Sequence, residues 1–305
     1  MKASIIICTC NRAHALADCL DSVAVAIRNS GTDMDKTEIV LVNNNSTDET
    51  ESVLKKWQES CGINTVYAFE ANQGLSYARN CGIRAASGDL IIFTDDDCIM
   101  DQNFLINAMK HDTDDEAPVL RGGRVELGDK NDLNLTTKTS LEKREWHKSK
   151  NSARHENISE AILGASMIMK RRLIDTVGLF DTRLGAGSPI KAGEDTDYIY
   201  RSYLAGYRIK YEPDMSIHHF HGRKTPAEGF KLLANYCTGN GALYMKYLFR
   251  EPNFCRAFYW DIRWMIKDML LRKNTYLPDI GFSYAHKIFY NLKGAALFIR
   301  ATIAP

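Results

Sequence analysis

The sequence lacks several features that would place it in common protein classes. No stretch has the roughly 18 consecutive apolar residues that a membrane-spanning helix needs. The apolar run at residues 5–8 is too short for the core of a signal peptide. The eight cysteines include no CxxC pair, which disfavours a zinc site, and several lie within apolar runs, as reduced and buried thiols would. We therefore expect a cytoplasmic protein.

The chain also lacks a strong overall charge and a glycine-rich phosphate loop. Its 39 Lys and Arg residues nearly balance 38 Asp and Glu residues, whereas a dedicated nucleic-acid-binding protein is usually strongly basic. No GxxxxGK[ST] motif is present, which disfavours kinase or GTPase chemistry. We expect no nucleic-acid partner. The charge is uneven, however, because residues 231–305 hold 11 basic against four acidic residues, a net charge of +7.

What is present over the first hundred residues is an alternation of strand and helix patterns. Continuous apolar runs typical of buried parallel strands occur at residues 5–8, 38–42, 66–69 and 90–94. Segments with helical spacing lie between them, at residues 14–28, 48–59 and 75–86. This order predicts an α/β fold with a parallel sheet. Ligands bind such sheets at the carboxyl ends of the strands, so we expect the polar residues 9–12, 43–48 and 95–97 to line one edge.

The remainder of the chain is patterned less regularly. We expect an antiparallel edge strand at 119–127, a mobile charged segment at 142–150, and a strand within 161–170. Helices are expected at 172–177, 195–205, 230–248 and 258–271, with a strand at 208–212. A last helix carries a basic stripe of His286, Lys293 and Arg300. The stripe fits a helix on an anionic membrane and equally a helix packed on the rest of the protein, and the sequence leaves both open.

The acidic triplet Asp95, Asp96 and Asp97 follows directly after an apolar run. Three adjacent carboxylates repel one another, and a divalent cation would offset that repulsion. In an extended segment Asp95 and Asp97 point to the same side, so they are candidates to share one metal ion. A solvated turn that caps the helix after it is the alternative interpretation.

Two further clusters have side chains suited to chemistry. Glu194 and Asp195 follow a glycine at the start of a helix, where acidic residues are ordinary caps but where a carboxylate can also take a proton from a hydroxyl. His219 and His221 would project to one side of an extended segment, an arrangement suited to a metal ion or a phosphate. A purely structural role for these histidines is the alternative.

Several motifs occur in a fixed order that resembles family 2 of the inverting glycosyltransferases. They lie at residues 10–12, 42–48, 72–74, 78–80, 95–97, 178–181 and 193–197. The resemblance covers about residues 1–225 and implies the GT-A fold, which has a Rossmann-like, mostly parallel central sheet flanked by helices. It implies a nucleotide-binding half at 1–111 and an acceptor-binding half at 112–225. The helical patterns that follow predict a helical C-terminal extension at 226–305.

The resemblance also implies an activity and a cofactor. Members of the family transfer a sugar with inversion from a nucleotide-diphosphate donor, here expected to be a UDP-sugar, to a hydroxyl of a glycan or lipid-linked acceptor. Many relatives build cell-surface polysaccharides, which implies work in the cytoplasm on the inner face of the membrane. The implied cofactor is a divalent cation, Mn²⁺ or Mg²⁺.

Site residues follow from matching motif positions. The implied nucleotide contacts are Thr9, Asn11, Arg12, Asn43, Arg79, Asp95 and Asp96. The implied metal ligands are Asp95, Asp97 and a late histidine, His219 or His221. Asp195 falls at the catalytic base, with Glu194 beside it. The family usually has Asp where this chain has Asn43, which leaves the nucleotide base open.

Two other functions deserve consideration. A catalytically inactive nucleotide-sugar-binding protein is favoured by Asn43 and disfavoured by the intact Asp95, Asp97 and Asp195. A nucleotidyltransferase would usually have a glycine-rich loop after its first strand, and residues 9–13 contain no glycine.

Overall fold

The computed structural model describes residues 2–31, 36–115, 117–148, 158, 161–250 and 256–303. The chain divides into two compact units. We call Met1–Phe180 together with Tyr198–Gly222 the sheet unit, and Asp181–Asp197 together with Arg223–Pro305 the helical unit.

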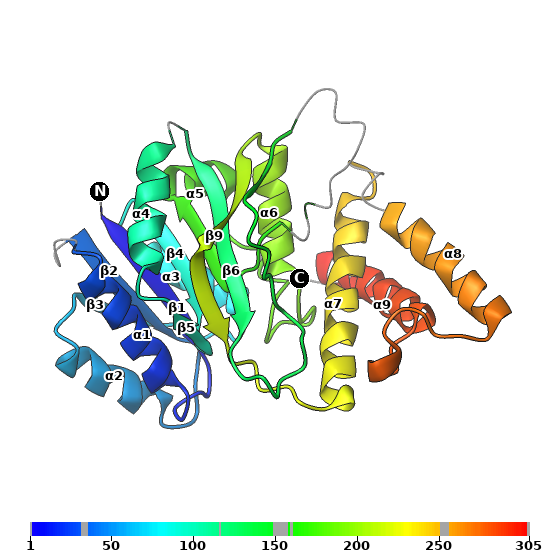
Figure 1. The fold of residues 1–305 in the computed structure, drawn as a ribbon, viewed down its shortest axis with the longest axis horizontal. Helices are drawn as coiled ribbons and strands as arrows, with labels where there is room; N and C mark the ends of the chain where they lie inside the picture. Colours follow the sequence, from blue (N-terminus) through cyan, green and yellow to red (C-terminus); the bar gives the residue numbers. More distant parts are fainter. Residues whose placement is uncertain are drawn as a thin grey trace. The chain divides into compact units, whose positions relative to one another are not determined.

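The sheet unit contains a mostly parallel central sheet, as the sequence predicts. Within the described residues the strand order is β3-β2-β1-β4-β8-β6-β9-β5, and β7 pairs with β9. Figure 1 shows this sheet with helices packed against it. The strands are β1 (Ala3–Thr9), β2 (Thr37–Asn43), β3 (Thr65–Phe69), β4 (Leu90–Asp95), β5 (Cys98–Met100), β6 (Val119–Leu127), β7 (Arg144–Trp146), β8 (Ser166–Lys170) and β9 (Arg208–His219). The chain adds β2 and β3 on one side of β1 and then β4 on the other, and ligand sites form at such a switch.

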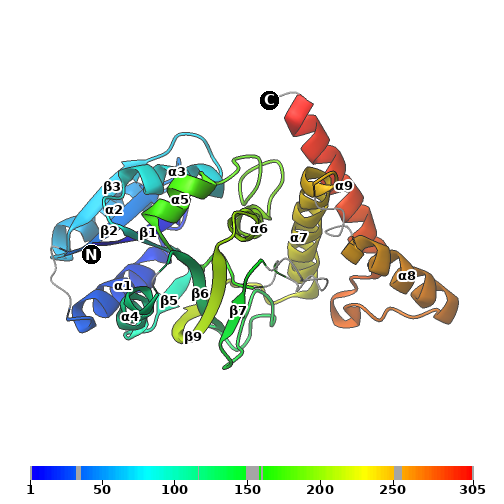
Figure 2. The same ribbon diagram turned by 90° about the horizontal axis from the view of Figure 1, so that it is seen from above.

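Helices cover both faces of this sheet. Those assigned to the sheet unit are α1 (Leu16–Asn29), α2 (Thr50–Ser60), α3 (Leu75–Ala85), α4 (Phe104–Asp114), α5 (Arg171–Val177) and most of α6 (Glu194–Leu204). Side chains alternate along β1, so Ile5 and Ile7 pack with α1 and α4 on one face. Helix α3 covers the other face (Figure 2). On that face Gly82 of α3 approaches Ile6 too closely for a Cβ atom.

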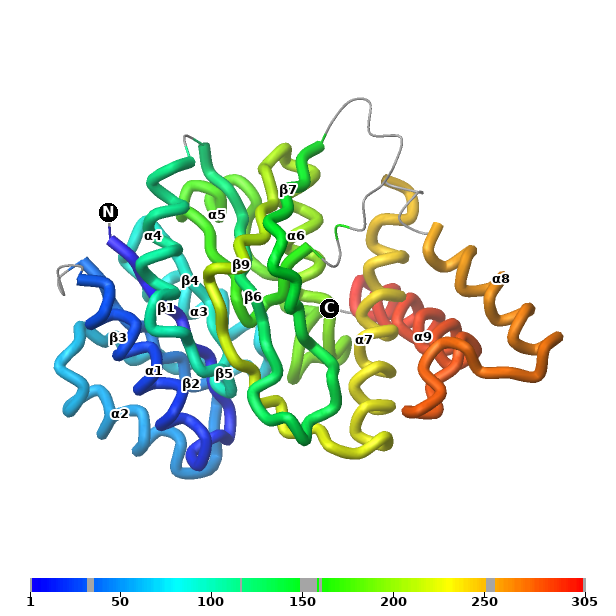
Figure 3. Tube along the Cα trace, in the orientation of Figure 1, coloured from blue at the N-terminus to red at the C-terminus, as the bar shows by residue number. Residues whose placement is uncertain are grey.

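Two predictions for the middle of the chain are wrong. β6 is not an edge strand, because it lies between β8 and β9 and pairs antiparallel with β8 but parallel with β9. Figure 3 shows β6 and β9 beside each other. The charged segment at 142–150 is not wholly mobile, since residues 144–146 form β7 on β9 and Trp146 is buried. Residues 149–150 of that segment lie outside the described residues.

Two strands of the sheet unit also differ from expectation. The sequence analysis missed β5. It expected a strand at 208–212 and a separate extended segment at the late histidines, whereas β9 runs continuously through Pro213. The register of β6 against β9 shifts between Gly123 and Arg124, so the ladder absorbs the irregularity at Pro213 without ending.

The helical unit is built on α7 (Pro226–Tyr247), α8 (Arg256–Leu271) and α9 (Tyr284–Ile303), with a 3₁₀ turn at Pro278–Ile280. α9 packs along α7, and α8 contacts α9. Glycines set the first contact: Gly294 lies against the backbone of Thr238, and Gly241 against the backbone of Asn291. No helix among the described residues is long and apolar enough to cross a membrane.

Candidate active site

The polar ends of three parallel strands lie beside one another in the sheet unit. Thr9 of β1 is the Cα partner of Asn43 of β2, and Cys8 is the partner of Asp95 of β4. Residues that are distant in sequence therefore share one edge of the sheet, because the parallel strands end at the same level.

Two arginines face the acidic triplet. Arg79 on α3 is buried, with its Nη2 atom 3.2 Å from Oδ1 of Asp95 and its guanidinium over the ring of Phe93. Arg12 reaches the other two carboxylates, at 3.1 Å from Asp97 and 3.8 Å from Asp96. The chain itself thus supplies cations that offset part of the repulsion between the three carboxylates.

The triplet is extended only as far as Asp95, because Asp96 and Asp97 form a turn between β4 and β5. The strict alternation expected from an extended segment is therefore absent. Burial raises the pKa of Asp96 to about 6, and the negative charges of Asp95 and Asp97 act in the same direction, against Arg12. Asp96 consequently differs electrostatically from its two neighbours.

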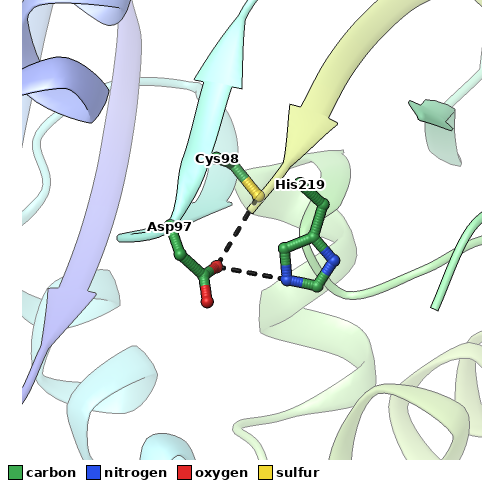
Figure 4. Close-up of side chains that lie close together, drawn as sticks. All are labelled: Asp97, Cys98 and His219. Atoms are coloured by element: carbon green, nitrogen blue, oxygen red, sulfur yellow. Dashed lines mark hydrogen bonds and ion pairs between the residues drawn. The ribbon is translucent and has the colours of Figure 1, made fainter. Parts of the chain in front are cut away.

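The pairing of β5 with β9 brings Asp97 to His219. Cys98 is the register partner of His219, and the backbone N–H of Phe220 donates to the carbonyl oxygen of Asp97 at 2.8 Å. The Nε2 atom of His219 lies 3.2 Å from Oδ1 of Asp97 (Figure 4). The Sγ atom of Cys98 is 4.0 Å from the same oxygen. Asp97, Cys98 and His219 form one group whose potential ligand atoms all lie within 4.8 Å of one another.

Thr136, which the sequence gave no reason to select, orients His219. Its hydroxyl lies 3.2 Å from Nδ1 of His219, on the side of the ring away from Asp97. Thr136 has a φ of 58°, a conformation that β-branched residues rarely adopt. Burial acts to lower the pKa of His219, but the hydrogen bond to Asp97 and the charge of that carboxylate raise it overall.

The predicted metal ligands are only partly brought together. His221 is buried nearby, its ring centroid 5.5 Å from that of His219, but its Nε2 atom lies 3.0 Å from the carbonyl oxygen of Leu133. Asp95 is paired with Arg79. Neither belongs to the group formed around Asp97, and their roles as metal ligands stay predictions.

The donor atoms of Asp97 and His219 fit a divalent cation such as Mn²⁺. A carboxylate and an imidazole are ligands that this ion accepts, and their 3.2 Å separation is close to that of adjacent ligands around one ion with bonds of about 2.1 Å. The thiol of Cys98 is a soft ligand and suits Mn²⁺ or Mg²⁺ poorly. Asp97 and His219 are therefore the residues that would hold the metal.

The asparagines at the ends of β1 and β2 order the loops that follow these strands. Oδ1 of Asn11 accepts a hydrogen bond from the N–H of Thr47 at 2.7 Å, and Oδ1 of Asn43 accepts one from Ser46 at 3.0 Å. Asn44, which sequence reasoning passed over, donates to the carbonyl of Asn72 at 2.7 Å and accepts from the N–H of Gly74. The run of three asparagines was a visible signal, but only the structure shows that Asn44 fixes the start of α3.

Glu194 and Asp195 lie in the helical unit, in the first turn of α6. Glu194 is buried against Gly185, and Oδ1 of Asp195 accepts a hydrogen bond from the N–H of Thr196 at 2.7 Å. Asp197 in the same turn is fully buried and is held by Lys246 of α7 at 2.6 Å. The turn that carries Asp195 is thus fixed by an ion pair whose carboxylate is buried.

A second group of possible metal ligands is accounted for by ion pairs. Nε2 of His111 lies 2.9 Å from Asp214 and 3.8 Å from Glu212, and Lys143 is 3.0 Å from the same oxygen of Glu212. Lys143 already supplies a positive charge, so the arrangement calls for no metal ion.

The chain belongs to glycosyl transferase family 2, because the model of that family matches residues 4–177. It is similar to poly-β-1,6-N-acetyl-D-glucosamine synthase of Staphylococcus aureus (strain COL), with 28% identity over 210 residues, which are 67% of this chain and 46% of that protein. An uncharacterized glycosyltransferase of Nostoc sp. is 35% identical over 97 residues, 32% of this chain and 28% of that protein. The chain thus spans less than half the length of these curated relatives.

Solved structures show the same fold. S. aureus TarS (residues 1–349) gives a TM-score of 0.57 at 16% identity and covers 99% of this chain and 92% of that one. The mannosyltransferase PcManGT from Pyrobaculum calidifontis, in complex with GDP-Man and Mn²⁺, gives 0.56 at 18% identity and covers 100% and 76%. At this identity the likeness establishes the GT-A fold alone, which confirms the fold expected from the motifs.

Proposed function

We propose that this chain is an inverting, divalent-metal-dependent glycosyltransferase that moves a sugar from a UDP-sugar to a hydroxyl of a glycan or lipid-linked acceptor. The observation that carries the proposal is the pairing of Asp97 with His219 at the switch point of the sheet. The solved complexes of TarS with UDP-GlcNAc and of PcManGT with GDP-Man and Mn²⁺ support a nucleotide-sugar donor and a divalent metal.

The reaction needs negative charge to be stabilised on the departing diphosphate oxygen. A divalent cation at Asp97 and His219 would supply positive charge there. Arg12 is oriented by Asp96 and Asp97, and Arg79 by Asp95, so both guanidiniums are positioned to hold the donor at this edge. The proposed nucleotide contacts are completed by Thr9, Asn11 and Asn43.

Asp195 is proposed to be the catalytic base. Its carboxylate takes the proton of the acceptor hydroxyl while that oxygen bonds to the anomeric carbon and the bond from carbon to diphosphate oxygen breaks. The products are the inverted glycoside, the nucleoside diphosphate and a protonated Asp195. Glu194 and the ion pair of Asp197 with Lys246 keep the first turn of α6 in place.

The name of the staphylococcal relative supports a role in polysaccharide synthesis. We propose that the enzyme works in the cytoplasm, on the inner face of the membrane, where lipid-linked acceptors are elongated. The excess of basic residues in the C-terminal 75 residues supports contact with an anionic surface.

Asp195→Asn tests the base. We expect it to lower transfer by about 10²- to 10⁴-fold while leaving donor affinity nearly unchanged, because Asn keeps the size of the side chain but takes no proton. Sugar transfer and calorimetric binding of UDP-GlcNAc with Mn²⁺ are the measurements. Asp97→Ala is the matched comparison and should instead weaken Mn²⁺-dependent donor binding. Transfer by Asp195→Asn near the wild-type rate would remove the base assignment.

Asn43 favours one second candidate, a protein that binds a nucleotide sugar without turning it over. Its amide is fully buried and donates to the hydroxyl of Tyr67 at 3.2 Å, where relatives usually have a carboxylate. A thermal-shift screen of UDP, GDP, dTDP and CDP sugars identifies the donor, since a bound ligand stabilises the folded state. Hydrolysis or transfer of the best ligand with Mn²⁺ then excludes the inactive alternative.

A further inference from the structure

Helix α8 buries acidic residues and exposes large apolar ones, which is the reverse of what an ordinary surface helix does with these residue types. Its two buried residues are both acidic, Asp261 and Asp268. Its exposed residues include large apolar side chains: Met269 is 69% exposed, Leu270 80% and Leu271 52%. A helix that only covers a core would turn these apolar side chains inward. The outward apolar surface therefore needs a partner.

The orientation of α8 is set by polar contacts. Oδ1 of Asp261 pairs with Lys287 of α9 at 2.8 Å. Asp268 accepts hydrogen bonds from the N–H and the hydroxyl of Thr275, at 3.0 and 2.8 Å. Turning the apolar residues inward would expose these two carboxylates and break the ion pair within the helical unit. The polar contacts of Asp261 and Asp268 thus hold the apolar side chains of α8 on the outside of this unit.

The exposed charges around α8 have one sign. Residues 256–273 contain only two acidic side chains, and both are the buried ones. All five basic side chains of this segment are exposed, namely Arg256, Arg263, Lys267, Arg272 and Lys273. The surface of α8 is therefore complementary to a negatively charged partner.

The basic and aromatic side chains lie together on what we call the α8 outer face, which consists of Tyr259, Trp260, Arg263, Trp264, Lys267 and Leu270. The guanidinium of Arg263 lies 5.1 Å from the ring centroid of Trp260, and Nζ of Lys267 lies 4.3 Å from that of Trp264. Two of the four tryptophans of the chain are on this face. Tryptophan is enriched where proteins meet the interface between bilayer and water, and Lys and Arg side chains there reach lipid phosphates.

Helix α9 also exposes apolar and basic side chains. It has no acidic residue, and Phe289, Leu292 and Ile303 are exposed along it. Lys293 and Arg300 of the predicted basic stripe are exposed as well, but His286 is half-buried against Phe230 and Ser283 and does not belong to that surface. The stripe predicted from the sequence is thus incomplete, and the exposed basic and aromatic residues of α8 are the stronger evidence for a surface that binds a negatively charged partner.

We infer that the α8 outer face binds the surface of an anionic lipid bilayer. A second copy of the chain is a poorer occupant, because a symmetric contact would place Arg263 and Lys267 against their own copies and bring like charges together. The inference deepens the membrane contact proposed for the C-terminal 75 residues, and it is independent of the proposed catalytic activity because it uses no residue assigned to the site.

Vesicle binding by the full chain tests this inference. We expect wild type to co-sediment with vesicles of phosphatidylglycerol and phosphatidylcholine and not with pure phosphatidylcholine vesicles. Arg263→Ala with Lys267→Ala should lower the partition coefficient by about 30-fold, because each basic side chain near an anionic surface contributes about 1 kcal/mol. Trp260→Ala with Trp264→Ala should also weaken binding.

The matched control is Lys55→Ala with Lys56→Ala, which removes two exposed charges from α2 of the sheet unit. It should bind like wild type, and a loss equal to that of the α8 variant would overturn the inference. The inference would also be overturned if wild type did not bind phosphatidylglycerol vesicles but formed a dimer that is lost in the Trp260→Ala and Trp264→Ala variant. Donor hydrolysis should be unchanged in all these variants, so failure of lipid binding and failure of the proposed activity are separate results.

Discussion

At the scale of single residues, Thr136 has an uncommon backbone conformation, and its hydroxyl lies within hydrogen-bond distance of Nδ1 of His219. Such outer partners fix the orientation of a metal-ligating imidazole and its tautomer. Thr136→Val keeps the shape and removes the hydroxyl. We expect Mn²⁺ affinity, measured by titration of donor binding, to fall by about 10-fold or more.

Thr137 provides the matched control for that substitution. Its hydroxyl bonds to Oδ1 of Asn134 and not to a residue of the site. Thr137→Val should leave Mn²⁺ affinity unchanged. If both variants behave alike, Thr136 has no positioning role and the contact to His219 is incidental.

Single residues of the site were predictable only where their neighbours in sequence revealed them. The acidic triplet and the late histidines stood out as clusters, but which histidine meets which carboxylate depends on β5, a strand of three residues. A run of three residues carries too little periodicity to be recognised. Thr136 gave no signal at all, because its role comes from a backbone angle and a partner 83 residues away.

At the scale of elements, the contact of α7 with α9 depends on glycine. A Cβ atom on Gly294 would collide with the carbonyl oxygen of Thr238, which is backbone and cannot rotate away. Gly294→Ala should therefore lower the free energy of unfolding by about 1–3 kcal/mol, measured in urea. Ala296→Ser on the exposed side of α9 is the control and should change it by about 0.5 kcal/mol or less. Equal effects of the two substitutions would show that moving α9 away from α7 does not lower the free energy of unfolding.

Elements were predicted best where one period held over many residues. The first four parallel strands and the helices between them follow from runs such as residues 5–8, because a strand buried on both faces is continuously apolar. The later strands have both parallel and antiparallel neighbours, so the sequence pattern of β6 predicts an edge strand although β6 lies inside the sheet. The local pattern of apolar residues predicts whether a strand is buried, but it does not predict which other strand it pairs with.

At the scale of the whole molecule, Glu38 couples stability to pH. Burial alone would raise its pKa, but hydrogen bonds from Ser4, from the N–H and hydroxyl of Ser87, and from Lys2 lower it to about 2. The folded-state pKa lies below the unfolded value of about 4.5. This contribution is therefore complete above pH 4.5 and is lost as the pH falls toward 2.

Glu38→Gln tests that coupling. The variant should be less stable than wild type near neutral pH by up to about 3 kcal/mol, and the difference should shrink as the pH falls from 4.5 to 2. Urea unfolding across this range is the measurement. Glu59→Gln, at an exposed position on α2, should keep the wild-type pH dependence. A difference that stays constant with pH would mean that the carboxylate of Glu38 is not the titrating group.

The pairing of β5 with β9 has a consequence for biosynthesis. During translation Asp97 leaves the ribosome about 120 residues before His219. The nascent chain therefore carries an incomplete form of the proposed cation site until β9 has been made and has docked beside β5. The proposed binding of Mn²⁺ by both side chains therefore cannot guide early folding, because it requires that the last strand of the sheet is already in place.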